Sequence, residues 1–166
     1  MRALLLFSVC FICFYSCKSV IEETISAQEY NDKMIAIQKD VDDALVKLIV
    51  AIESFDKEAM PIQLDNALTI TEEAIETLSE QEESAQFENY EKEIKNLLKV
   101  YKSIISVELN EIVEIFLMPD EDYTEEHEQR VYELFDEALT RYSIALANFS
   151  DFQVKFADAN ELELRE

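Results

Sequence analysis

The chain contains no glycine in any of its 166 positions, and this absence restricts its possible folds more than any other feature. Glycine adopts positive φ angles at the lowest steric cost, so tight β-hairpin turns usually depend on it. The P-loop, the dinucleotide-binding fingerprint and the G-x-S-x-G motif of serine hydrolases all require glycine, so these motifs are absent. Ala, Glu, Leu, Ile and Lys dominate, and only Pro61 and Pro119 could interrupt a helix. This composition predicts an all-α protein with long helices.

Four segments place apolar residues at alternating intervals of three and four, which is the spacing of one face of an α-helix. The predicted helices cover residues 26–55, 58–80, 85–117 and 124–158. Asp56 is a suitable N-cap for the second helix, and either Asp122, with Glu125 three residues later, or Thr124 could cap the fourth. Four amphipathic helices with short connections pack most simply as an up-down-up-down four-helix bundle. We therefore expect a four-helix bundle domain at residues 26–166, with no β-strand.

One acidic residue falls near the apolar face of the third predicted helix. Glu108 follows Ile104 by four residues and precedes Ile112 by four residues, so a regular helix turns it toward the core. Because an unpaired charge is rarely buried, we expect a slight rotation of the helix to expose the Glu108 carboxylate to water.

The first twenty residues, MRALLLFSVCFICFYSCKSV, indicate an export signal. Arg2 precedes an apolar block at residues 3–16, which in a helix would span about 21 Å and so falls short of a hydrocarbon core of about 30 Å. A basic start, a short apolar region and a small residue at its end are typical of a secretory signal peptide. All the cysteines lie here, so the remaining chain has no thiol for a disulfide or a thiolate metal site.

The sequence FYSC at residues 14–17 resembles the lipobox of bacterial lipoproteins, because small Ser16 directly precedes Cys17 and polar sequence follows. In that family the cysteine thiol carries diacylglycerol, and cleavage before the cysteine makes it the new N-terminus. Phe14 and Tyr15 stand where the family prefers Leu and a small residue, which resembles the relaxed lipoboxes of Bacteroidota-type lipoproteins.

The lipobox resemblance implies a domain organisation. It implies a signal peptide at residues 1–16, lipidation of Cys17 and a lipidated tether at residues 17–25. Lys18 follows the cysteine, and in the lipoprotein family this residue does not signal retention at the inner membrane, so the implied location is the outer membrane. A plain signal peptide and an uncleaved N-terminal anchor are the alternative interpretations.

The wider pattern resembles a family of bacterial surface lipoproteins that have a helical bundle and no established activity. The resemblance depends on FYSC, on EYNDKMIAIQKDVDDAL at the start of the first predicted helix, and on the late segment NFSDFQVKFADANELEL. It implies a lipid-anchored bundle in the cell envelope, on either the surface or the periplasmic side. It provides no catalytic residues to carry over.

The strongly acidic composition limits the possible partners. Asp and Glu total 37 residues and Lys and Arg total 14, which gives a net charge of −23 at pH 7. Such a surface repels nucleic acid and anionic lipid headgroups, so we expect neither as a partner. The expected contacts are the membrane, through a lipid on Cys17, and a partner protein, and we expect a monomer.

The sequence offers no pattern for a metal centre or a catalytic site. A di-iron bundle needs Glu-x-x-His pairs, but Thr124 stands three residues before His127, which is the only histidine. A calcium loop at residues 120–131 would need Gly and Glu where Glu125 and Val131 stand. Pairs of acids fall almost entirely on polar helix faces, where solvation rather than catalysis explains them. We therefore expect no metal, no cofactor and no enzymatic activity.

Two functional hypotheses follow from these observations. The first is a non-enzymatic, lipid-anchored envelope or surface protein that acts as a protein-binding or structural module. The alternative is a carrier that holds a small apolar ligand within the bundle core. Its possible lining residues are Tyr101, Tyr142, Phe149 and Phe152. Aromatic residues at helical spacing are also what ordinary core packing requires, so the pattern alone does not separate the two roles.

Overall fold

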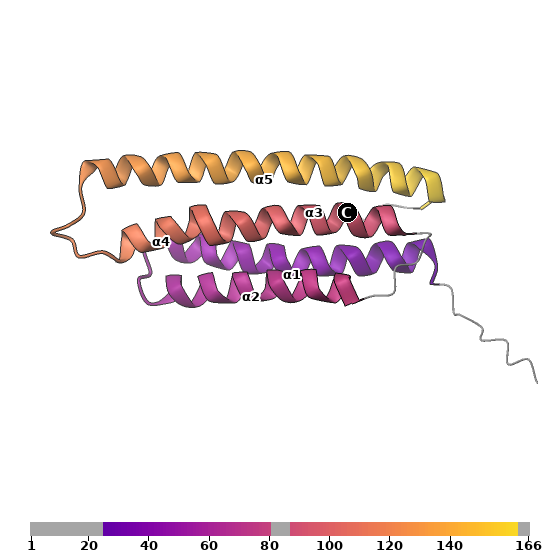
Figure 1. Ribbon diagram of the computed structural model, residues 1–166, viewed down its shortest axis with the longest axis horizontal. Helices are drawn as coiled ribbons and strands as arrows, with labels where there is room; N and C mark the ends of the chain where they lie inside the picture. The colour runs from indigo at the N-terminus through magenta and orange to yellow at the C-terminus, as the bar shows by residue number, and fades with distance from the viewer. Residues whose placement is uncertain (1–24, 81–86, 163–166) are drawn as a thin grey trace, which may run out of the picture.

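The computed structural model describes residues 25–80 and 87–162, and every regular element in these ranges is helical. The elements are α1 (Ala27–Glu53), α2 (Ala59–Glu80), α3 (Glu88–Ile104), the π-helical turn η1 (Ile105–Leu109), α4 (Asn110–Leu117) and α5 (Glu125–Asn160). Because α3, η1 and α4 follow one another directly, the chain forms four helical rods, which run in alternate directions along one long axis (Figure 1). The predicted all-α class is confirmed for the described residues.

Some predictions for the N-terminal region concern residues outside these ranges. The predicted signal peptide at residues 1–16 and the predicted lipidation site Cys17 lie outside the described residues. The predicted tether at residues 17–25 lies outside them as well, apart from Ile25. These interpretations therefore stay predictions.

Polar side chains cap the helices where the sequence places them. Ser26 Oγ accepts a hydrogen bond from Glu29 N at 3.2 Å, and the Glu29 carboxylate accepts one from Ser26 N at 3.0 Å, which forms a capping box. The predicted cap Asp56 is confirmed, because its Oδ1 accepts from two backbone N–H groups at the start of α2, at 3.0 and 3.2 Å. Of the two caps predicted for the fourth helix, Thr124 is the N-cap directly before α5, and its backbone N donates to His127 Nδ1 at 3.2 Å.

Two helix ends adopt the left-handed conformation that favours glycine. Phe55 after α1 and Glu161 after α5 have φ angles of 54° and 55°. A residue with a Cβ atom in this conformation costs about 1–2 kcal/mol, so the lack of glycine leaves strain at both ends. At the first end, the Phe55 ring packs against Phe116 with a centroid distance of 4.9 Å, and this contact offsets part of the strain.

One continuous hydrophobic core joins the four rods. Its largest fully buried side chains include Met34, Leu48 and Ile52 of α1, Met60 and Leu78 of α2, Tyr90, Ile94 and Tyr101 of α3, and Phe149 of α5. Burying each such side chain stabilises the fold by about 1.5–3 kcal/mol. Because every rod contributes to the same core, the described helices form one domain.

The third rod is not a regular α-helix. In η1 the backbone N–H of Asn110 donates to the carbonyl oxygen of Ile105, five residues earlier, and the wider turn leaves Glu108 inside the fold. Glu108 is only 4% exposed, so the expectation that a rotation brings it to water is wrong. Its carboxylate instead forms an ion pair with Arg141 of α5, which also donates to Ser103 Oγ at 2.7 Å.

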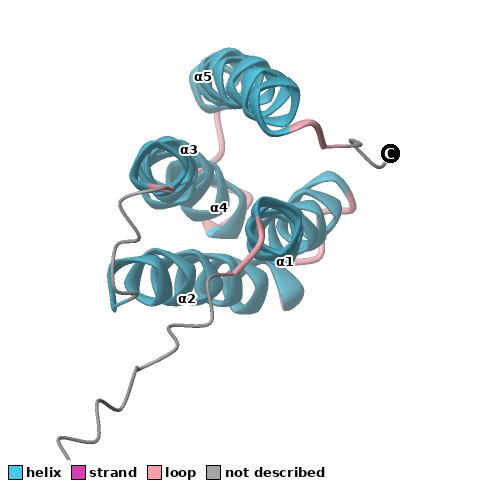
Figure 2. Ribbon diagram, turned by 90° about the vertical axis from the view of Figure 1, so that its right-hand side faces the viewer, coloured by secondary structure: helices cyan, strands magenta, loops and turns pink. Residues whose placement is uncertain are grey.

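The rods do not pack equally on all sides. α1 packs mainly against α2, α2 also packs against α3, and α5 packs against α3, η1 and α4. In the view along the bundle, α5 lies over α3 on the side opposite α2 (Figure 2). The bundle is therefore closely packed along α1, α2 and α3, and α5 is attached to it mainly through the third rod.

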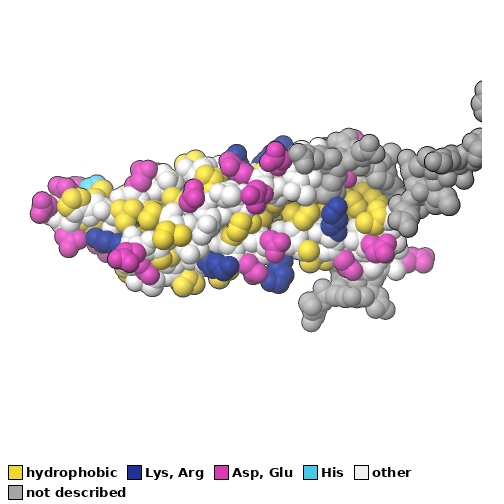
Figure 3. All heavy atoms as spheres, turned by 90° about the horizontal axis from the view of Figure 1, so that it is seen from below, with side chains coloured by type: hydrophobic (Ala, Val, Ile, Leu, Met, Phe, Trp, Pro, Cys, Tyr) yellow, Lys and Arg dark blue, Asp and Glu magenta, His cyan; other side chains and the backbone are white. Residues whose placement is uncertain are grey.

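The surface reflects the acidic composition. On the face seen from below in Figure 3, acidic, basic and apolar side chains are interspersed along the bundle, and acidic side chains gather near the histidine at one tip. Asp120, Glu121 and Asp122 of the α4–α5 connection are all exposed to solvent. Most of these charged side chains are therefore solvated, and among the described residues only Glu91 and Glu108 are buried charged groups.

Candidate functional site

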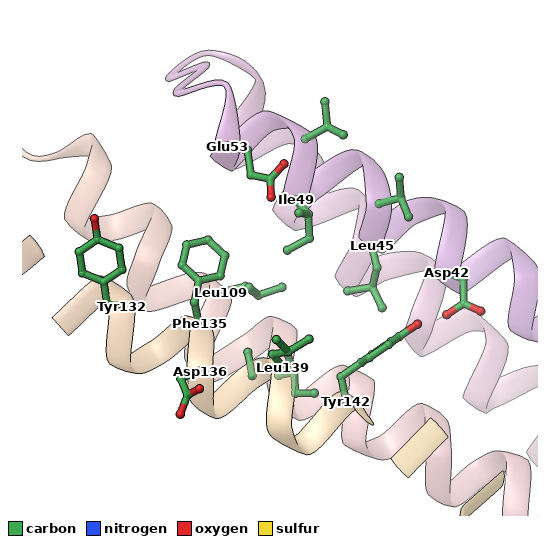
Figure 4. Close-up of a pocket in the computed structure, with 14 residues that line it drawn as sticks. Asp42, Leu45, Ile49, Glu53, Leu109, Tyr132, Phe135, Asp136, Leu139 and Tyr142 are labelled. Carbon is green, nitrogen blue, oxygen red and sulfur yellow. The ribbon is translucent and has the colours of Figure 1, made fainter. Parts of the chain in front are cut away.

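A cleft of about 740 Å³ runs between α1 and α5, and we call it the α1/α5 cleft. Figure 4 shows Leu45 and Ile49 of α1 on one side of it and Phe135 of α5 on the other. Ile104 of α3 and Leu109 of η1 also line it, so the third rod contributes to its wall. Sites for small molecules have volumes of about 300–1,000 Å³ and mostly apolar linings, and this cleft meets both criteria.

A second hollow of about 300 Å³ adjoins the cleft toward the α4–α5 connection. The two hollows share Glu53, Tyr132 and Phe135, while Phe55 and Phe116 line only the second. Together they form one apolar groove along the seam between α1 and α5. An elongated apolar molecule would fit such a groove better than a round one.

The rim of the cleft exposes large apolar side chains on both helices. Val46 and Val50 on α1 are 60% and 57% exposed, and Tyr132 and Leu139 on α5 are 67% and 64% exposed. The spacing of four places Val46 and Val50 on one face of α1. Apolar side chains gathered on both sides of a cleft indicate an interaction surface, whereas single scattered ones do not.

The charged residues that line the cleft are all acidic: Asp42, Glu53 and Asp136. Asp42 lies at one end, and burial raises the pKa of its carboxyl group above its usual range. Because neither Lys, Arg nor His lines the cleft, its electrostatic potential is negative.

Polar side chains are buried together at the Asp42 end of the cleft. Asp42 Oδ2 accepts a hydrogen bond from Gln38 Nε2 at 3.3 Å, and Oδ1 is buried. The Tyr101 hydroxyl is buried close by, where it can donate toward the Asp42 carboxylate. Burial, together with the nearby Asp42 charge, raises the pKa of Tyr101, so its phenol keeps its proton at neutral pH. Tyr142 reaches toward Asp42 from α5 (Figure 4).

The four predicted lining residues lie in two places. Tyr101 and Tyr142 stack with a centroid distance of 5.1 Å, and Tyr142 lines the cleft. Phe149 and Phe152 lie further along α5, where both rings pack edge-on against Tyr90 at centroid distances of 5.8 and 5.3 Å. The structure therefore brings the predicted residues together in pairs, and a ligand-lining role stays a prediction for each of them.

Sequence reasoning missed the part of the site that α1 contributes. Leu45 and Ile49 directly follow the buried Ala44 and Leu48, and they widen the apolar face of α1 toward α5. This widening was visible in the sequence as adjacent apolar pairs at 44–45 and 48–49. An apolar face wider than one neighbouring helix can cover would have indicated a surface left for another molecule.

Similarity to known proteins, grouped metal ligands and membrane-spanning helices are further indicators of function. Comparison with protein-family models, with curated proteins and with solved structures gives no match. Within residues 25–80 and 87–162, no three or more His, Cys, Asp and Glu side chains are grouped so that they could hold a metal ion. None of the helices described in these ranges combines the length and the apolar character of a membrane span.

Replacing Asp42 with Asn should stabilise the protein at neutral pH. The pKa of the Asp42 carboxyl group is raised in the folded state, so the folded protein holds a poorly solvated charge that the unfolded chain exposes to water. This penalty exists above the folded pKa and disappears as the pH falls below the unfolded value of about 3.9. Because solvent screens a half-buried side chain, we expect a gain of at most about 1 kcal/mol at pH 7 and none at about pH 3.

Urea unfolding followed by circular dichroism at both pH values measures this difference. Asp40→Asn is the matched control, because Asp40 is an exposed acid on the same helix. A loss of stability in Asp42→Asn at pH 7 would show that the ionised carboxylate stabilises the fold and would contradict the prediction.

Proposed function

We propose that this chain is a non-enzymatic, lipid-anchored binding protein of the cell envelope, which holds a small apolar molecule in the α1/α5 cleft. The observation that carries this proposal is the cleft itself, with its volume of about 740 Å³ and its mostly apolar lining. The proposal includes no metal, cofactor or nucleic acid.

The position of the cleft refines the carrier hypothesis. A ligand in the bundle core would have to displace Tyr90 and Phe149, which are fully buried and packed edge-on against each other. Interiors packed in this way have no room for a guest molecule. The α1/α5 cleft lies beside the core and is open to solvent along its rim, so a ligand can enter it without unpacking the core.

The exposed rim also supports a second candidate, the docking of a partner protein. Val46 and Val50 on one helix and Leu139 on the other could receive the apolar face of an added helix, which is a common mode of peptide recognition. A helix bound there would complete the seam between α1 and α5. The cleft volume, and the Ile104 and Leu109 side chains with which the third rod lines the cleft, favour a small molecule over a partner helix as the ligand.

The cleft proposal is tested by binding of Nile red, a neutral apolar dye, to purified protein. We expect its fluorescence to rise on binding and the affinity to fall about tenfold or more in the double variant Val50→Gln/Leu139→Gln, because two apolar contacts are lost. The double variant Ile62→Gln/Ile144→Gln is the matched control. Its two positions are each 59% exposed and lie outside the cleft. No binding, or an equal loss in both double variants, would overturn the proposal.

The lipid anchor is supported by the resemblance of FYSC to a lipobox and requires its own test. Replacing Cys17 with Ala is expected to move the protein from the membrane fraction of its own cells to the soluble fraction, because the acyl chains can no longer be attached. Cys13→Ala is the control and should leave the protein in the membrane fraction. Retention of Cys17→Ala in the membrane would instead indicate an uncleaved anchor.

A further inference from the structure

The seam between α1 and α5 leaves apolar surface on both helices uncovered. α5 packs against α3, η1 and α4 rather than against α1. Figure 4 shows Leu45 and Ile49 on one side of the resulting space and Phe135 and Leu139 on the other. A bundle helix normally buries its whole apolar face against its neighbours. Among the described residues, no element covers these two faces where they meet.

The uncovered surface has the length of a short helix. From Asp42 to Glu53 the cleft follows α1 for about 16 Å. The second hollow continues it past Glu53 to Phe55 and Glu128, and we call the two hollows together the α1/α5 groove. A helix of about 14 residues is about 21 Å long and therefore matches this groove.

The chain has an apolar segment of this length outside the described residues. Residues 3–16, ALLLFSVCFICFYS, contain no charged side chain. The other stretches outside the described ranges, QEESAQ at residues 81–86 and ELRE at residues 163–166, are short and mostly polar. Contact of 14 mostly apolar residues with water is unfavourable, so segment 3–16 requires an apolar surface to cover it for as long as it remains attached.

The connection to α1 is long enough to bring segment 3–16 into the groove. Residues 17–26 link it to Ala27 at the start of α1, and ten extended residues span at most about 33–36 Å. Asp42 lies only about 22 Å along the helix from Ala27. A segment that enters the groove at the Asp42 end then runs antiparallel to α1.

The charges at the two ends of the segment fit this direction. Lys18 follows the segment and comes to lie near Asp42, whereas Arg2 precedes it and comes to lie beyond Glu53, toward Glu128. The charged residues that line the groove are all acidic, so each basic flank meets charges of opposite sign. Length, apolar character and flanking charges therefore point to the same occupant.

We propose that segment 3–16 occupies the α1/α5 groove as a fifth helix in the chain that still carries it. The segment covers the exposed side chains of Val46, Val50 and Leu139, and its removal opens the cleft. This inference concerns the chain before residues 1–16 are removed, whereas the proposed function concerns the chain afterwards. Either one can therefore fail without the other.

Disulfide trapping in the full-length chain tests this placement. Synthesis in a cell-free system without membranes keeps the segment attached. Cys10→Ser/Cys17→Ser leaves Cys13 as the only native thiol, and either Val46→Cys or Leu139→Cys adds a second one. If Lys18 lies level with Asp42, the antiparallel segment places Cys13 beside these two rim positions. A disulfide forms only where the two Cα atoms approach to about 4.4–6.8 Å, so cross-linking reports on proximity.

Matched control sites lie on other surfaces of the bundle. Ile62→Cys and Ile144→Cys replace apolar residues that are each 59% exposed, like those of the rim, but lie outside the groove. We expect intramolecular cross-linking at Val46→Cys and Leu139→Cys to be at least about tenfold faster than at the controls, because docking raises the effective concentration of Cys13 at the rim alone. All four positions are exposed, so circular dichroism should show the same helix content in each variant.

A second series keeps Cys10 in place of Cys13 and tests the direction of the segment. Cys10 should cross-link faster to Val50→Cys than to Val46→Cys, and Cys13 should show the reverse order. The opposite preferences would overturn the antiparallel placement. Equal rates at the rim and the control sites would show that the segment does not occupy the groove. Cross-links that form only between chains would assign the groove to a second copy, and either result would overturn the proposal.

Discussion

Replacing Arg141 with Met is expected to lower the free energy of unfolding by about 3–5 kcal/mol, because it leaves a buried carboxylate without its partner. The Glu108 side chain is only 6% exposed, and its Oε2 atom has no hydrogen-bond partner among the described residues. The Arg141 guanidinium also donates to Ser103 Oγ at 2.7 Å, and this bond is lost as well. Methionine keeps an unbranched apolar chain of similar reach, so the loss reports mainly on the charge. Unfolding in guanidinium chloride, monitored by circular dichroism, measures this loss in the free energy of unfolding.

Two controls separate the ion pair from the loss of a positive charge. Lys155→Met removes a cation from an exposed position of α5 and should change stability by less than about 0.5 kcal/mol. The double variant Glu108→Met/Arg141→Met should recover most of the lost stability, because well-packed apolar side chains replace a buried ion pair at little net cost. A double variant no more stable than Arg141→Met alone would contradict this explanation.

Removing the hydroxyl from Tyr90 and from Tyr101 is expected to have different effects on stability. The Tyr90 hydroxyl donates to Asn31 Oδ1 at 2.8 Å and accepts from Gln153 Nε2 at 3.1 Å. Asn31 is 1% exposed, so Tyr90→Phe leaves a buried oxygen unpaired and should cost about 1–3 kcal/mol. The Tyr101 hydroxyl lies beside the Asp42 carboxylate but forms no hydrogen bond of good geometry with a described residue, so Tyr101→Phe should cost less than Tyr90→Phe.

Parallel urea unfolding of the two variants tests this difference under identical conditions. The chemical change is the same, and both rings are fully buried in α3, so packing contributes little to the difference. Equal losses in both variants would show that the Tyr101 hydroxyl has a stabilising partner in solution.

The helices could be predicted from the sequence because local signals agree with the fold. The predicted ranges 26–55 and 58–80 end within two residues of α1 and α2, since Ser26 and Asp56 mark the helix starts by their own hydrogen bonds. Apolar periodicity fixed which face of each helix is buried. Caps and periodicity depend on neighbours within a few residues, and a single sequence contains them completely.

The π-helical turn η1 and the α1/α5 cleft depend on contacts between residues far apart in the chain, which no local sequence pattern contains. Glu108 is buried because Arg141, 33 residues later, meets it from α5. Whether Leu45 and Ile49 face another helix or an open cleft depends on where α5 lies over the third rod. Periodicity indicates that a face is apolar, but the helix that covers it is decided by tertiary packing.

The position of the cleft along α1 sets how far a bound molecule would lie from the N-terminal end of that helix. α1 begins at Ala27, so the cleft starts about 22 Å along the helix at Asp42 and ends about 39 Å along it at Glu53. With the proposed lipid on Cys17, the tethered end is the end away from the cleft. A ligand in the cleft would therefore lie at least about 22 Å along α1 from the proposed attachment side, and its binding would not involve the attached end of the bundle.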